Sequence, residues 1–179
     1  MSRNIVVLSG SPRKGGSTDT LTAAFVEGAQ SAGKSVSVFR TADMKINGCI
    51  GCSYCFHEQV SCAQFDDDME QIWEALRNAD AIVFASPVYF FSVSAQLKLA
   101  IDRTYSMPNV ENSIKKTAML LTCGDNSGKA AEGALFMHKR MVNHRNWDDA
   151  GVITAAGANN GLDDGRKELE QARSLGREI

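Results

Sequence analysis

A chain of 179 residues is long enough for one domain with a sizeable core and short for two. Hydrophobic residues make up 44% and charged residues 22%, which is ordinary globular usage and argues against disorder. The formal net charge of -2 leaves no basic surplus for a nucleic-acid backbone, so we expect no nucleic-acid partner. The first apolar segment stops at Ser9, which is too short for a signal peptide or a membrane span. We therefore expect a cytoplasmic protein without a membrane partner.

Strand-like apolar runs alternate with helical patterns along the chain. The first run, at 4–10, ends at a glycine and is followed by apolar residues at helical spacing over 18–32. Further strands are predicted at 36–40, 80–85, 117–123 and 151–156, and further helices at 67–78, 94–105, 129–145 and 163–175. Strands that alternate with helices predict an α/β fold, in which one parallel sheet is covered by helices on both faces. We expect this single domain to extend over residues 1–179, with a cysteine-rich loop at 47–65.

A loop rich in hydroxyls and glycines, residues 9–19, follows the first predicted strand and opens a helix. Free amides at a helix N-terminus favour an anion, and Gly15 and Gly16 allow the backbone to approach it. Arg13 could add a positive charge. A Walker A loop would need lysine where Gly16 stands, and a dinucleotide fingerprint would need glycine where Pro12 stands. The pattern therefore indicates a site for a single phosphomonoester, with a solvated turn capped by Ser17 as the alternative.

Three adjacent aromatic residues, Tyr89 to Phe91, follow the third predicted strand, and a helical pattern begins at Ala95. They could not all point into the core, and a flat heteroaromatic ring offers the stacking surface that they need. Backbone amides from Pro87 to Phe91 would serve the polar edge of such a ring. A cluster in the core or at an interface is the alternative.

Four of the five cysteines follow the spacing C-x2-C-x2-C-x6-C, at Cys49, Cys52, Cys55 and Cys62. Such crowding in a reducing compartment favours metal, cluster or redox chemistry over a disulfide framework. The first three share the spacing of bacterial ferredoxin ligands, so one iron-sulfur cluster is a candidate occupant. Free thiols, a zinc site and a redox-active dithiol remain alternatives. The acidic run Asp66–Asp68 that follows is predicted to cap the next helix.

The segments Gly10–Thr18, Ser86–Tyr89, Leu97–Lys98 and Asp102–Arg103 together resemble the NADPH-dependent FMN reductase and iron-sulfur flavoprotein family. The resemblance implies a flavodoxin-like sandwich with strand order 2-1-3-4-5. It also implies that the first loop holds the phosphate of FMN and that the second lines the isoalloxazine ring. Phosphate contacts would come from Ser9, Ser11, Arg13, Ser17 and Thr18. Ring contacts would come from Pro87, Val88, Tyr89, Phe90, Phe91 and, after the fourth strand, Gly124.

The resemblance further implies an FMN-dependent oxidoreductase that passes electrons from NAD(P)H to a small acceptor such as a quinone, nitro or azo compound. The cofactor carries this chemistry, so no side chain is predicted to act as acid or base. The compact cysteine motif resembles that of iron-sulfur flavoproteins, which implies a four-iron four-sulfur cluster and a carrier such as ferredoxin. Relatives pair their subunits, which implies a homodimer or homotetramer.

Two further functions stay open. One is a non-enzymatic electron carrier of the flavodoxin type, which the charge of -2 disfavours because flavodoxins are strongly acidic. The other is a flavin or cluster sensor that signals by binding a protein partner.

Overall fold

The computed structural model describes residues 3–62, 65–109 and 112–179. Its strands are β1 (Asn4–Ser9), β2 (Ser35–Arg40), β3 (Ala81–Tyr89), β4 (Ser92–Val93), β5 (Lys116–Thr122) and β6 (Asp148–Ala155). Its α-helices are α1 (Ser17–Ser31), α2 (Tyr54–His57), α3 (Met69–Arg77), α4 (Ala95–Arg103), α5 (Glu132–Arg145) and α6 (Lys167–Glu178). Short 3-10 helices lie at Thr41–Asp43, Thr104–Asn109, Lys129–Ala131 and Ala158–Asn160.

The parallel strands of the sheet lie in the order β2-β1-β3-β5-β6. Counted without the short β4, this is the order 2-1-3-4-5, and the flavodoxin-like α/β prediction is confirmed. β4 is an addition that the sequence did not predict, and it pairs antiparallel with the end of β3 through Val88 and Tyr89. The third strand, predicted to end at residue 85, continues to Tyr89 because Ser86 and Pro87 remain paired with β5.

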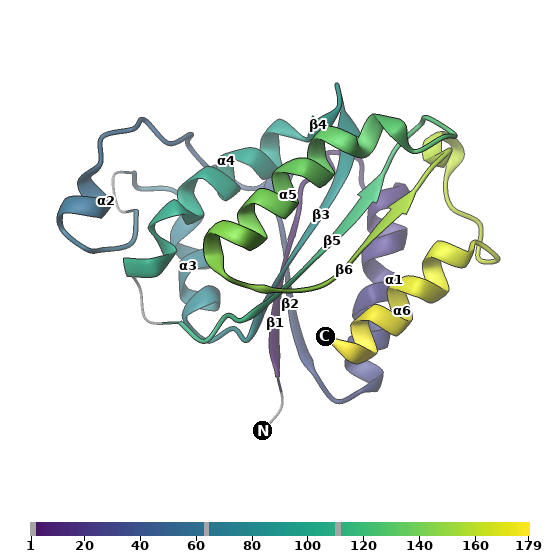
Figure 1. Cartoon of the computed structure of the whole chain (residues 1–179), viewed down its shortest axis with the longest axis horizontal. Coiled ribbons are helices and arrows are strands. Elements are labelled where there is room, and N and C mark those ends of the chain that lie inside the picture. The colour runs from purple at the N-terminus through teal and green to yellow at the C-terminus, as the bar shows by residue number, and fades with distance from the viewer. Residues whose placement is uncertain (1–2, 63–64, 110–111) are drawn as a thin grey trace.

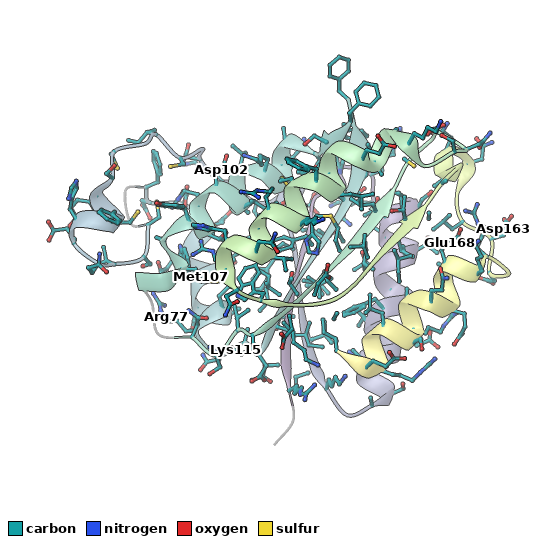
Figure 2. All side chains as sticks on the ribbon, viewed as in Figure 1. Arg77, Asp102, Met107, Lys115, Asp163 and Glu168 are labelled. Carbon is teal, nitrogen blue, oxygen red and sulfur yellow. The ribbon has the colours of Figure 1, made fainter. Side chains whose placement is uncertain are left out.

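Helices cover both faces of the sheet, as Figure 1 shows. α1 and α6 pack on one face, and α3, α4 and α5 pack on the other. Successive residues of β1 face opposite cores, with Val6 and Leu8 in one and Ile5 and Val7 in the other. A parallel strand buried on both faces reads as a continuous apolar run, which is the pattern that the sequence shows here. Side chains fill the space between these layers (Figure 2).

The long connection between β2 and α3 contains the short α2 and projects from one end of the molecule, beside α3 and α4 (Figure 1). It includes the predicted cysteine-rich loop, whose residues 63 and 64 lie outside the described residues. Within the part of the chain that the structure describes, no helix has the length and apolarity needed to span a membrane.

Candidate functional site

A hollow lies where the carboxyl ends of β1, β3, β5 and β6 meet, which is where ligands bind in open parallel sheets. It encloses roughly 420 Å³ of space, including its open mouth. The lining residues are Ser11, Arg13, Gly16, Ser17, Thr18, Pro87, Val88, Tyr89, Thr122, Cys123, Gly124, Ala158 and Asn159. The structure thus brings together eight residues that the sequence assigned to phosphate or ring: Ser11, Arg13, Ser17, Thr18, Pro87, Val88, Tyr89 and Gly124.

The N-terminus of α1 forms the phosphate side of this hollow. Gly16 is the N-cap, and among the described residues no side chain caps the first turn. The predicted alternative of a cap by Ser17 is wrong, since Ser17 is already helical and its hydroxyl donates to the Ala158 carbonyl at 2.6 Å. The first amides of a 15-residue helix are therefore left for another acceptor, and an anion suits both these amides and the helix dipole.

Arg40, on β2, braces the loop that precedes α1. Its Nη2 donates to the Ser11 carbonyl at 3.2 Å, and its Nη1 pairs with Asp19. Asp19 in turn accepts a hydrogen bond at 2.8 Å from the amide of Gly15, whose φ of +69° lies in the left-handed region that glycine adopts freely. Arg13 lines the hollow and forms no ion pair with the described residues. The charge of Arg13 is therefore available to a phosphate, whereas that of Arg40 is engaged in holding the loop.

The phosphate loop is also fixed to the start of α4. The hydroxyl of Ser94 donates to the Gly10 carbonyl at 2.7 Å and caps α4 by accepting from the amide of Leu97 at 3.3 Å. A Cβ on Gly10 would stand 2.4 Å from this hydroxyl and 2.5 Å from the Cβ of Leu97. Only glycine fits here, and it lets the first loop and the β3–α4 connection meet.

The sequence predicted Gly16 as a point of close backbone approach, but it predicted no contact from four other lining residues: Thr122, Cys123, Ala158 and Asn159. The hydroxyl of Thr122 hydrogen-bonds that of Thr18 at 2.8 Å, which joins β5 to α1. Burial, and after it the charge of Asp125, raises the pKa of Cys123, so its thiol is held neutral. Thr122 and Cys123 could have been found from their position at the end of a predicted strand. Asn159 carried no such signal.

Three predicted contact residues do not line the hollow. Ser9 is buried, and its hydroxyl has no hydrogen-bond partner among the described residues. Phe90 and Phe91 form the tip of the β3–β4 hairpin and are 96% and 61% exposed. Their rings contact each other edge to face, with centroids 5.6 Å apart.

The four cysteines of the cysteine-rich loop remain accessible, with Cys49 and Cys52 exposed and Cys55 and Cys62 half-buried. All five cysteines are described and none forms a disulfide. Burial raises the pKa of Cys55, and the Cys62 thiol raises it further, with smaller contributions from Cys49 and Cys52. No three His, Cys, Asp or Glu groups among the described residues are arranged to hold a metal ion.

The acidic run after this loop caps the next helix, as predicted, through Asp67, whose Oδ1 accepts a hydrogen bond from the amide of Met69 at 3.2 Å. α3 begins at Met69, and its N-cap, Asp68, makes no side-chain cap. The side chain of Asp67 is also buried and pairs with Arg103 of α4 at 2.9 Å. Burial by itself would raise the pKa of Asp67, but hydrogen bonds from Arg103 and Asn47 outweigh it and hold the pKa below its usual value. The predicted cap is therefore present, and the sequence missed only the buried ion pair that the same carboxylate forms.

A family model described as NADPH-dependent FMN reductase matches residues 3–156. The chain belongs to this family. An iron-sulfur flavoprotein of Methanosarcina thermophila is 32% identical over 142 residues, which cover 78% of this chain and 73% of that relative. Iron-sulfur flavoproteins of Methanocaldococcus jannaschii and Archaeoglobus fulgidus are 38% and 37% identical over 56% and 55% of this chain. The matched region spans about half the length of these two relatives, at 51% and 44%.

Solved structures share the fold of this chain. An NAD(P)H:quinone oxidoreductase from Methanothermobacter marburgensis is similar with a TM-score of 0.79 and 21% identity, over 99% of this chain and 96% of that one. An azoreductase from Bacillus anthracis is similar with a TM-score of 0.71 and 17% identity, over the whole of both chains. These likenesses confirm the flavodoxin-like fold that the sequence predicts.

Proposed function

We propose that this protein binds FMN in the hollow at the ends of β1, β3, β5 and β6 and passes electrons from NAD(P)H to a small acceptor. The observation that carries this proposal is the meeting of an uncapped helix N-terminus with the ends of β3 and β5 in one hollow. When bound, FMN would supply hydride acceptance and onward electron transfer, which protein side chains lack. Quinones, nitro compounds and azo compounds are the acceptor classes we propose. The names of the structural neighbours support the first and last of these.

The residues divide by chemistry between the two ends of the cofactor. We assign the phosphate to the amides of the first turn of α1, the hydroxyls of Ser11, Ser17 and Thr18, and the guanidinium of Arg13. We assign the ring to the segment from Pro87 to Tyr89 and to the backbone at Gly124. A Cβ on Gly124 would stand 2.3 Å from the side chain of Asn159. Glycine at this position therefore leaves room for both the flavin ring and the Asn159 side chain. Ser9, Phe90 and Phe91 stay outside the proposed contacts because they do not line the hollow.

Anaerobic reduction tests the enzymatic part of this proposal. FMN-loaded protein mixed with NADPH or NADH should lose its flavin absorbance, and a quinone added afterwards should restore it. If neither nicotinamide bleaches the flavin while reduced ferredoxin does, the protein is a carrier rather than a reductase.

The second candidate adds an iron-sulfur centre. We propose that Cys49, Cys52, Cys55 and Cys62 hold a four-iron four-sulfur cluster that exchanges electrons with a ferredoxin-like carrier. Support comes from the four thiols on one loop and from the names of the relatives in Methanosarcina and Methanocaldococcus. The thiols would have to converge on the iron, and metal binding commonly couples to such local ordering. Analysis after anaerobic purification should find about four irons and as many sulfides per chain, lost in Cys52→Ala. A chain without iron would remove this candidate and leave the first one intact.

We also propose that the protein assembles as a homodimer or homotetramer. Exposed aromatic side chains support this, with Phe90 at 96% and Phe136 at 68% exposed. Such side chains are commonly covered when subunits associate. Light scattering coupled to gel filtration should report a multiple of the chain mass, and a monomer would contradict the proposal.

A further inference from the structure

One buried guanidinium joins the two ends of the stretch that carries the four cysteines. Arg103, at the end of α4, is only 1% exposed. Its Nη1 donates to the carbonyl of Asn47 at 3.2 Å, and its Nη2 donates to the carbonyl of Cys62 at 3.0 Å. Asn47 precedes the first cysteine and Cys62 is the fourth, so a single side chain closes the loop at its base.

Asp67 balances the charge of this guanidinium and holds the same loop end. Its carboxylate lies 2.9 Å from Nη1 of Arg103, and both side chains are 1% exposed. The same carboxylate accepts hydrogen bonds from the backbone amide and the side-chain amide of Asn47, at 2.9 and 3.1 Å. The ring of Phe65 covers the guanidinium, with its centroid 5.0 Å from Cζ.

The peptide groups on both sides of Cys62 are fixed as well. Its amide donates to the hydroxyl of Ser106 at 3.0 Å, while its carbonyl accepts from Arg103. Ser106 is 1% exposed and lies in the 3-10 helix Thr104–Asn109 that follows α4, so α4 and this extension hold Cys62 from both directions. By contrast, Cys49 and Cys52 are exposed. The base of the loop is rigidly bonded, whereas its cysteine-bearing middle is open.

A buried ion pair is a poor device for stability alone, because desolvation of the two charges offsets much of their attraction. Such a pair contributes more to the fixed geometry of the groups that it contacts than to the free energy of unfolding. We propose that Arg103 and Asp67 are positioning residues that fix the base of the cysteine-rich loop so that its four thiols can close around an iron-sulfur cluster; this rests on the proposed cluster site. Closing a loop whose ends are already joined costs less chain entropy, and groups behind metal ligands commonly tune metal affinity.

The pair also sets the charge beside the proposed cluster. Asp67 neutralises Arg103, whose guanidinium bonds directly to the carbonyl of a proposed ligand, Cys62. In Asp67→Asn the carboxylate is lost and the guanidinium charge stays. A positive charge stabilises the reduced, more negative form of a cluster, so the reduction potential should move in the positive direction. A purely structural role would not produce this shift.

The test compares four variants with the wild-type holoprotein: Arg103→Lys, Asp67→Asn, Ser106→Ala and the control Asp102→Asn. Asp102 lies on the same helix (Figure 2). Its carboxylate pairs with Lys98 at the surface. Lysine retains the charge at position 103 but lacks the planar fork that reaches two carbonyls. Ser106→Ala removes one hydrogen bond without exposing a buried charge, so it tests the base of the loop if the charge variants fold poorly. The amount of FMN that each variant binds shows whether that variant is folded.

In the FMN-loaded proteins, iron release to a chelator should be about tenfold faster in Arg103→Lys than in the wild type. Asp67→Asn should have a more positive cluster potential, measured by a redox titration followed by electron paramagnetic resonance. Asp102→Asn should match the wild type in both. Wild-type iron retention in Arg103→Lys and Ser106→Ala, with an unchanged potential in Asp67→Asn, would overturn the positioning role.

A readout without iron separates this inference from the cluster proposal. In cluster-free protein, alkylation of Cys62 should be faster in Arg103→Lys and Ser106→Ala, with buried Cys123 as the internal reference. If the wild type takes up no iron but alkylation accelerates, the cluster proposal fails and the fixed loop base stands. Unchanged alkylation in both variants would contradict the fixed loop base itself.

Discussion

Two phenylalanines at the tip of the β3–β4 hairpin adopt left-handed backbone conformations. Phe90 has a φ of 46° and Phe91 a φ of 68°, although their side chains are 96% and 61% exposed. This conformation is unfavourable for a residue with a Cβ, and little packing compensates for it here. Strain of this kind is often retained near functional sites, and the hairpin adjoins Tyr89 of the hollow.

Replacement of Phe91 by glycine should therefore stabilise the protein. We expect the free energy of unfolding to rise by about 1 kcal/mol, because glycine adopts this φ without a steric cost. For a chain of this size the corresponding rise in Tm is about 3 °C, measured by thermal unfolding. Phe91→Ala is the control, since it removes the ring but keeps the Cβ. Equal stability gains in both variants would mean that the backbone conformation is not the cause.

Arg13 should distinguish FMN from a flavin without phosphate. We expect Arg13→Ala to weaken FMN binding about tenfold, because a charge-assisted hydrogen bond to phosphate is lost. Riboflavin binding should be unchanged, as measured by flavin fluorescence titration. Lys14→Ala is the matched control, since Lys14 does not line the hollow and pairs with Asp43 at 3.3 Å. An equal loss for both flavins would remove the phosphate role of Arg13.

At the scale of elements, α1 and α6 approach each other through glycines. A Cβ on Gly28 would stand 2.0 Å from the carbonyl oxygen of Arg173, and one on Gly176 would stand 2.2 Å from that of Phe25. Both obstacles are backbone atoms, which can move only if the helices separate. The close packing of these two helices therefore depends on the absence of two side chains.

Gly176→Ala should lower the free energy of unfolding by about 2 kcal/mol, the usual cost of overpacking. This loss exceeds the gain of about 1 kcal/mol that alanine brings to a helix interior. Chemical denaturation measures the difference. Gly165→Ala is the control, since nothing lies within 4 Å of its added Cβ, and its stability should not fall. A Gly176→Ala protein as stable as the wild type would show that the helices can shift apart freely.

The order of these elements could be predicted from the sequence, but their contacts could not. The spacing of Leu21, Ala24 and Phe25 predicts α1 because helical periodicity is local. That Gly28 meets α6 depends on tertiary packing, which no local pattern encodes. The same holds for Asp67, whose cap on the Met69 amide is local and predictable, but whose partner Arg103 comes from another helix.

At the scale of the whole molecule, the hollow joins loops that are far apart in the sequence. The loop at 9–19 and the segment after β3 were predictable because each carries its own motif. Ala158 and Asn159 follow β6 and carry no motif, so only the sheet order brings them to Ser17. Sequence reasoning therefore predicted two walls of the site and missed the third.

Stability should depend on pH through His138, which α5 buries against Asp149 of β6. His138 is 1% exposed, with Nε2 3.4 Å from the carboxylate. Burial lowers the pKa of His138, and the opposing effect of Asp149 is smaller. The unfolded chain therefore binds a proton at a higher pH than the folded protein, so stability falls as the pH drops through the ordinary histidine range. Tm should decline between about pH 7.5 and about pH 5.5, and less so in His138→Phe. Identical slopes in the two proteins would exclude His138 as the cause.

The most direct test of the central claim is a titration of flavin-free protein with FMN and with riboflavin. We predict tight FMN binding, with a Kd of about 1 µM or lower, and riboflavin binding at least about tenfold weaker, because the amides at the start of α1 recognise the phosphate. Failure to bind FMN, or equal affinity for both flavins, would contradict the account.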